Sequence, residues 1–80
     1  MKFNKEYTIV KNSLKEALDY IDMFESKMSI FIEKYPKYTY NLNINKNDGD
    51  EWVLNIRIRN NDKQSNDKTS DEIIRSFDVL

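Results

Sequence analysis

Two stretches in the middle of the chain alternate between apolar and polar side chains. The first covers residues 38–46 and the second residues 51–59, with a short polar segment between them. Alternation with a period of two is typical of β-strands that bury one face, so the pair predicts a β-hairpin. The two apolar rows are Tyr38, Tyr40, Leu42 and Ile44 on the first strand and Trp52, Leu54, Ile56 and Ile58 on the second.

The segment between these strands contains Gly49, the only glycine of the chain. A three-residue loop, 47–49, would pair Ile44 with Trp52 and keep both apolar rows on one face, because a one-residue shift moves every side chain to the other face. Such a loop needs a left-handed backbone at its third residue, which glycine adopts at little steric cost. We therefore predict a positive φ at Gly49 and Ile44 opposite Trp52.

A long apolar stripe with helical spacing precedes the hairpin. Ser13 and Glu16 fit a capping box, in which the hydroxyl and the carboxylate each accept a backbone N–H. Pro36 disfavours helical geometry at Tyr35. The pattern predicts a helix over residues 14–34, about 30 Å long and thus as long as either strand. The stripe consists of Leu14, Ala17, Leu18, Ile21, Phe24, Met28, Phe31, Ile32 and Tyr35.

The two ends of the chain complete the pattern of elements. Residues 3–10 include a β-branched and aromatic run, which predicts a first strand. Residues 60–70 carry no apolar side chain and are predicted to form a polar mobile loop. After it, Thr69 with Glu72, or Ser70 alone, would cap a short helix. The apolar residues of that helix are Ile73, Ile74 and Phe77.

The order β-α-β-β-α predicts a two-layer α+β fold in a single small domain, residues 1–80. The hairpin and the long amphipathic helix each have one apolar face and bury it against the other, with Trp52 and Leu54 packed on the helix stripe. We expect the first strand beside the third, which gives a small antiparallel sheet of order 1-3-2. The short C-terminal helix would cover the rest of the same sheet face.

The chain lacks the side chains that most enzymes use in catalysis. It has no cysteine, no histidine and one glycine, so thiol nucleophiles, imidazole bases and glycine-rich phosphate loops are excluded. The acidic residues Asp48, Asp50 and Glu51 do not form a calcium loop, because Ile44 and Lys46 occupy two of the ligand positions. We expect no enzymatic activity, no metal and no cofactor.

Charge and composition favour some partners, cellular locations and genetic origins over others. Thirteen basic and fourteen acidic side chains leave a net charge of −1, which disfavours a dedicated nucleic-acid polycation. The longest apolar run is residues 30–32, so no membrane span is expected, and without an apolar signal segment we expect a cytoplasmic location. Asn, Lys, Ile, Tyr and Phe, which have A/T-rich codons, make up nearly half of the chain. This bias suggests a phage or another mobile element.

Two surfaces are candidates for binding. The first is the polar face of the hairpin, the outer sheet face, where two arginines on one side of a strand can offer guanidinium groups to carboxylates. Its candidate residues are Arg57, Arg59, Asn41, Asn43 and Asn55. The second is the outer helix face, where apolar residues beside a charge can mark an interface. Its candidate residues are Tyr20, Met23, Lys27 and Ile30.

We therefore predict a non-enzymatic protein-binding module, an inhibitor or regulator of a host protein, that acts through the outer sheet face. One alternative is a small nucleic-acid-binding protein that uses the same face. It is disfavoured because the aromatic residues that could stack on bases, Tyr38, Tyr40 and Trp52, lie on the opposite row. A second alternative is a structural homodimer that forms through the outer helix face.

Overall fold

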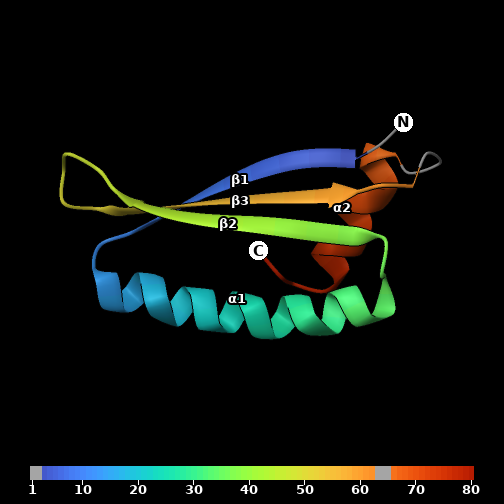
Figure 1. Ribbon diagram of the computed structural model, residues 1–80, viewed down its shortest axis with the longest axis horizontal. Helices are drawn as coiled ribbons and strands as arrows, with labels where there is room; N and C mark the ends of the chain where they lie inside the picture. Colours follow the sequence, from blue (N-terminus) through green and yellow to red (C-terminus); the bar gives the residue numbers. More distant parts are fainter. Residues whose placement is uncertain (1–2, 63–65) are drawn as a thin grey trace.

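The computed structural model describes residues 3–62 and 66–80 and contains a three-stranded antiparallel sheet with two helices on one of its faces (Figure 1). Strand β3 lies between β1 and β2, so the order in the sheet is 1-3-2. The predicted α+β fold class and the order of its elements are confirmed. The elements are β1 (Phe3–Lys11), α1 (Leu14–Lys34), β2 (Tyr38–Lys46), β3 (Trp52–Asn60) and α2 (Asp67–Ser76).

The registers on both sides of β3 bring the three apolar rows onto one face. Ile56 of β3 lies between Tyr7 of β1 and Leu42 of β2. The neighbouring residue, Arg57, lies between Glu6 and Asn41. Successive side chains of a strand point to opposite faces, so one face of the sheet is apolar and turned toward α1, and the outer sheet face is polar.

The hairpin register differs from the predicted one by two residues. Ile44 lies opposite Leu54, and Lys46 lies opposite Trp52, so the loop has five residues instead of three. Gly49 does not have a positive φ; Asp50 does, at 60°. Our predicted register and the predicted conformation of Gly49 are therefore wrong. The predicted faces remain correct, because a shift of two residues preserves the alternation.

The side chain of Asn47 explains the longer loop. Its Oδ1 accepts the backbone N–H groups of Gly49 and Glu51 at 3.0 and 2.9 Å, and its own N–H donates to the Glu51 carbonyl at 2.9 Å. Asparagine often organises turns in this way, and aspartate tolerates the left-handed region better than most residues. Asn47 and Asp50 thus form the turn that we expected Gly49 to form.

Helix α1 has the predicted bounds. Its N-cap is Ser13, whose side chain accepts the N–H of Glu16 at 3.2 Å. The Glu16 carboxylate reaches one residue further back than in a standard capping box and accepts the N–H of Asn12 at 3.3 Å. At the other end, Tyr35 donates its N–H to Phe31, and Pro36 follows.

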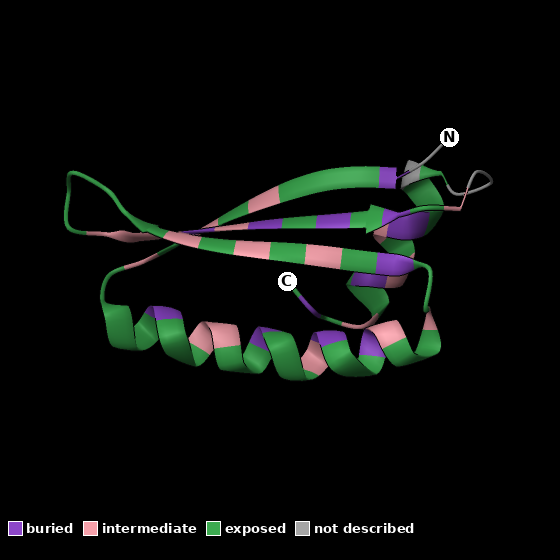
Figure 2. Cartoon of the chain, in the orientation of Figure 1, coloured by how far each residue is buried: buried purple, intermediate pink, exposed green. Residues whose placement is uncertain are grey.

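The core is densest where α1, the start of β2 and α2 meet. The ring of Phe31 contacts Tyr38 at 5.0 Å, Phe77 at 5.1 Å and Tyr35 at 5.4 Å between centroids. Such edge-to-face and tilted aromatic pairs add to the free energy gained from burial. Figure 2 shows the buried residues of α1 on the side toward the sheet. The buried apolar cluster consists of Phe3, Phe24, Met28, Phe31, Tyr38, Ile56, Ile58, Ile74 and Val79.

At the hairpin end the two layers are more open than we predicted. Leu14 and Leu18 are 44% and 49% exposed, and Trp52 is only half-buried, although Leu54 is fully buried as expected. The hairpin tip extends beyond the start of α1, and α2 covers the sheet only at the opposite end (Figure 1). The flank of the helix stripe therefore has no element against it in the described residues, and the prediction that Leu14 and Leu18 belong to the core is wrong.

Helix α2 starts earlier than predicted, so the polar loop is shorter. Its N-cap is Asn66, which accepts the N–H of Thr69 at 2.8 Å, rather than Thr69 or Ser70. Asn60 ends β3 and is buried, and Ser70 lies inside α2, so neither belongs to the predicted loop 60–70. Residues 63–65 of that predicted mobile loop lie outside the described residues.

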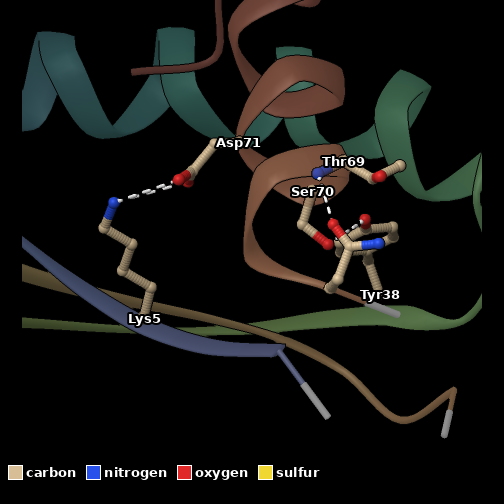
Figure 3. Close-up of polar contacts among 6 residues, drawn as sticks. Lys5, Tyr38, Thr69, Ser70 and Asp71 are labelled. Carbon is tan, nitrogen blue, oxygen red and sulfur yellow. Dashed lines mark hydrogen bonds and ion pairs between the residues drawn. The ribbon is translucent and has the colours of Figure 1, made fainter. Parts of the chain in front are cut away.

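Two polar contacts attach α2 to the sheet (Figure 3). The buried hydroxyl of Tyr38 donates to Ser70 Oγ at 2.9 Å, and Lys5 Nζ lies 3.4 Å from the Asp71 carboxylate. Because Ser70 is buried, its hydroxyl needs such a partner. The hydrogen bond adds to the burial of Ile74 in holding α2 against the sheet.

The loop geometry predicts opposite effects at two neighbouring positions. A Cβ at Gly49 would meet only Asn47 Oδ1 at 3.6 Å and Glu51 Oε1 at 3.7 Å, so Gly49→Ala should leave the free energy of unfolding unchanged or raise it by up to about 1 kcal/mol. Asp50→Val should lower it by about 1–2 kcal/mol, because a β-branched residue is strained at positive φ. Urea denaturation measures both changes. The reverse ranking would support the three-residue loop.

The uneven core predicts different costs for two similar truncations. Leu54→Ala should lower the free energy of unfolding by about 2–5 kcal/mol, because it leaves a cavity at a fully buried site. The matched control, Leu18→Ala, should cost less than about 1 kcal/mol, because half of its side chain already meets solvent. Equal costs would show that α1 covers the hairpin end more closely than the structure indicates.

Candidate binding surfaces

The outer sheet face is a regular array of polar side chains. Asn55 lies between Thr8 and Asn43, and two residues further along β3 Arg57 lies between Glu6 and Asn41. These residues are exposed, apart from Asn55, which is half-buried. No element covers this face in residues 3–62 and 66–80, since both helices lie on the other side (Figure 1).

Arg57 is held by an ion pair that the sequence analysis missed. Its Nη2 lies 2.8 Å from Glu6 Oε2, and both side chains are exposed. An exposed pair of this kind contributes about 0–1 kcal/mol, but it orients the guanidinium and offsets its charge. The missed signal is the alternation within β1, which puts Glu6 on the polar row once β1 is paired with β3.

The structure brings four of the five predicted sheet-face residues around one shallow hollow of about 120 Å³. Its lining consists of Glu6, Asn41, Asn43, Asn55 and Arg57. Arg59 is the exception. It lies between Asn4 and Thr39 on the same face and borders a separate hollow near the start of β1. Among the described residues Arg59 forms no ion pair, so its guanidinium is the more available of the two.

The outer helix face is only partly as predicted. Met23 and Ile30 are 39% and 63% exposed. Lys27 does not stand free beside them: its Nζ donates to the Asp78 carbonyl at 2.7 Å and lies 3.4 Å from the Asp78 carboxylate. Lys27 thus fixes the C-terminal residues against α1, and the remaining apolar surface is small.

Tyr20 does not belong to the outer helix face. It is half-buried, and its ring is nearly parallel to that of Phe24, 6.3 Å between centroids. Lys11 Nζ lies 5.1 Å from the centre of the Tyr20 ring, which is a cation–π distance. The assignment of Tyr20 to the second surface was wrong because this residue lies on the flank of α1 that turns toward β1.

The hydroxyl of Tyr20 is buried and has no hydrogen-bond partner in the part of the chain that the structure describes. Burial disfavours the charged phenolate and raises the pKa of Tyr20 above its ordinary value of 10.0. Burial likewise raises the pKa of Tyr40, with a smaller contribution from the nearby Glu25 carboxylate. Burial and then the Asp71 carboxylate raise the pKa of Tyr7.

Two kinds of site are absent from the described residues. Within the described ranges, no three acidic side chains lie close enough together to hold a metal ion. Neither described helix is long and apolar enough to cross a bilayer. The chain matches no protein-family model, no curated protein and no solved structure.

The unpartnered hydroxyl of Tyr20 leads to a prediction about stability and pH. Because burial raises the pKa of Tyr20 in the folded state, the stability of the wild type is unaffected by this group below about pH 10 and falls as the pH rises from the unfolded pKa through the higher folded pKa. Tyr20→Phe should leave the free energy of unfolding at pH 7 unchanged or raise it by about 1 kcal/mol, since it removes an unsatisfied polar group. The variant should also lose less stability than wild type between about pH 9 and pH 11.

The matched control for this experiment is Tyr38→Phe. The Tyr38 hydroxyl donates to the buried Ser70, so its removal should lower the free energy of unfolding by about 1–2 kcal/mol at pH 7. Urea denaturation at several pH values measures both variants. If Tyr20→Phe is as destabilising as Tyr38→Phe, then the Tyr20 hydroxyl has a partner in solution.

Proposed function

We propose that this protein is a non-enzymatic protein-binding module that contacts its partner through the outer sheet face. The observation that supports this most directly is the uncovered array around Arg57 and Arg59 on the central strand of the sheet. Side chains on paired strands are held more rigidly than those on loops, so binding them costs less conformational entropy. Arginine is also among the residues most enriched at binding hot spots.

The chemistry of the face favours a partner with exposed carboxylates and amide groups. Arg59 can form a bidentate pair with a carboxylate, and the side chains of Asn41 and Asn43 can both donate and accept. Together with the coding bias, this supports an inhibitor or regulator of a host protein, encoded by a phage or mobile element and acting in the cytoplasm. The module would act by occupying a surface of that protein.

The same face supports nucleic-acid binding less well. Glu6 offsets the charge of Arg57, which leaves Arg59 as the unpaired cation of the array. The large aromatic side chains of the described strands lie on the inner face, where they cannot stack on a bound base. Nucleic-acid affinity would fall steeply with salt, because phosphate contacts release counterions, so a salt titration distinguishes the two partners.

The test uses two variants that preserve the fold of the sheet. Arg59→Glu reverses the unpaired charge. The exchange Glu6→Arg with Arg57→Glu inverts the other charges but keeps their ion pair, whereas Arg57→Glu alone would place two carboxylates together. After capture of a partner from host lysate and its purification, calorimetry measures each affinity. We expect each variant to weaken binding at least about tenfold, as the loss of a hot-spot contact does.

The control variant carries Met23→Glu and Ile30→Lys on the outer helix face. It should bind the partner as wild type does, because these residues lie on a different surface. If this control alone abolishes binding, or if the sheet-face variants bind normally, the proposal is wrong. Binding to DNA or RNA that disappears between low and moderate salt would instead support the nucleic-acid alternative.

A further inference from the structure

The two edges of the sheet differ in how well they are protected against pairing with another strand. On β1, the lysines Lys5 and Lys11 fall on the inner, apolar row. Lys5 also reaches α2 through Asp71, which brings the helix close to this edge (Figure 3). Inward-facing charges and a nearby helix are common devices that prevent edge-to-edge association.

Strand β2 has fewer of these protections among the described residues: Lys46 lies on its inner row only at the last position, opposite Trp52, and α2 contacts the strand at its first residue, Tyr38, through Ser70. It pairs with β3 in an uninterrupted register from Tyr38 to Lys46, without a bulge, and it contains no proline. Lys46, its last residue, carries the only charge of the strand. Its inner row contains Tyr40, Leu42 and Ile44, which are half-buried, so their outer parts still meet solvent. A long and regular edge whose residues 38–45 carry no charge is a template for another strand.

We propose that β2 pairs with β2 of a second copy of the chain, antiparallel and centred on Leu42, to form a continuous six-stranded sheet. In this register Tyr40 lies opposite Ile44 of the other copy, and Leu42 lies opposite its own counterpart. Asn41 lies opposite Asn43 on the outer sheet face. Apolar residues thus meet apolar residues and amides meet amides, and such cross-strand pairs stabilise sheets.

Charge along the edge favours the antiparallel direction. Lys34 and Lys37 precede β2, and Lys37 is paired with Asp62. Asp48, Asp50 and Glu51 follow the strand in the hairpin loop, where Asp50 is paired with Lys46, so the loop keeps an excess of negative charge. An antiparallel pair keeps the two acidic loops at opposite ends and places each beside the start of β2 in the other copy. A parallel pair would bring the two acidic loops together, where like charges repel.

Helix α1 offers a second contact on the same side of the molecule. Leu18 and Glu25 are seven residues apart and so lie on one flank of the helix, and Glu25 is close enough to Tyr40 of β2 to raise the pKa of its phenol. This is the flank on which Leu14 and Leu18 are exposed. Two copies joined through β2 would place the α1 flanks that carry these leucines on the same face of the six-stranded sheet and turned toward each other.

The test measures the mass of the purified chain alone by sedimentation equilibrium over a range of concentrations, so it is independent of the proposed protein partner. Wild type should approach twice the 9.6 kDa mass of one chain. The variant with Asn41→Lys and Asn43→Lys places lysine opposite lysine twice across the pair. It should dissociate at least about tenfold more readily, because like charges in opposed positions destabilise strand pairing.

The matched variant has Asn41→Lys and Asn43→Glu. It places lysine opposite glutamate in the same two positions and should remain a dimer. Circular dichroism and thermal melting check that both variants fold. A monomeric wild type, a Lys/Lys variant as dimeric as wild type, or a monomeric Lys/Glu variant would each overturn the proposal. Retained mass in the Lys/Lys variant that is lost on Met23→Glu, Ile30→Lys would place the contact on the outer helix face instead.

Discussion

The packing of Phe31 is the contact on which the rest of the architecture depends. Its ring joins the last turns of α1 to the first residue of β2 and to Phe77 at the end of α2. A chain of this size has little core, so its stability depends on a few large buried side chains. Because α2 packs at this end, the hairpin end is covered by α1 alone among the described residues (Figure 1). The exposed flank at Leu14 and Leu18 follows from that imbalance.

The hairpin shows how a local hydrogen bond can decide a register. Two pairing registers of the hairpin strands keep both apolar rows on one face only if they differ by an even number of residues. The three-residue and the five-residue loops both satisfy this condition. The Asn47 side chain stabilises the longer loop by accepting two backbone N–H groups. With Asp50 in the left-handed region, Gly49 loses the role that its conformational freedom suggested. The choice between these loops is an energetic one that residue alternation does not resolve.

The surfaces left for recognition follow from the same packing. Both helices lie on the inner face, so the outer sheet face with Arg57 and Arg59 meets solvent in the described residues. The ion pair with Glu6 makes this face a patterned polar surface rather than a basic one. In the described residues, Lys5, Lys11 and the Lys5–Asp71 contact with α2 protect the β1 edge, whereas β2 has a charge only at its last residue, Lys46. A fold with one covered face and one protected edge therefore offers two surfaces for association.

The residue pattern was enough to predict the order of elements, the bounds of α1, the faces of the hairpin strands and the order of the sheet. These features depend on period, caps and burial, which local residue patterns carry directly. It also grouped Arg57 with Asn41, Asn43 and Asn55, because side chains of one parity share a face. Three other features are seen only in the folded chain: Glu6 pairs with Arg57, Tyr20 turns inward, and Leu18 stays exposed. Each of these depends on how far one element extends along another, and that distance is set by packing between residues far apart in the chain.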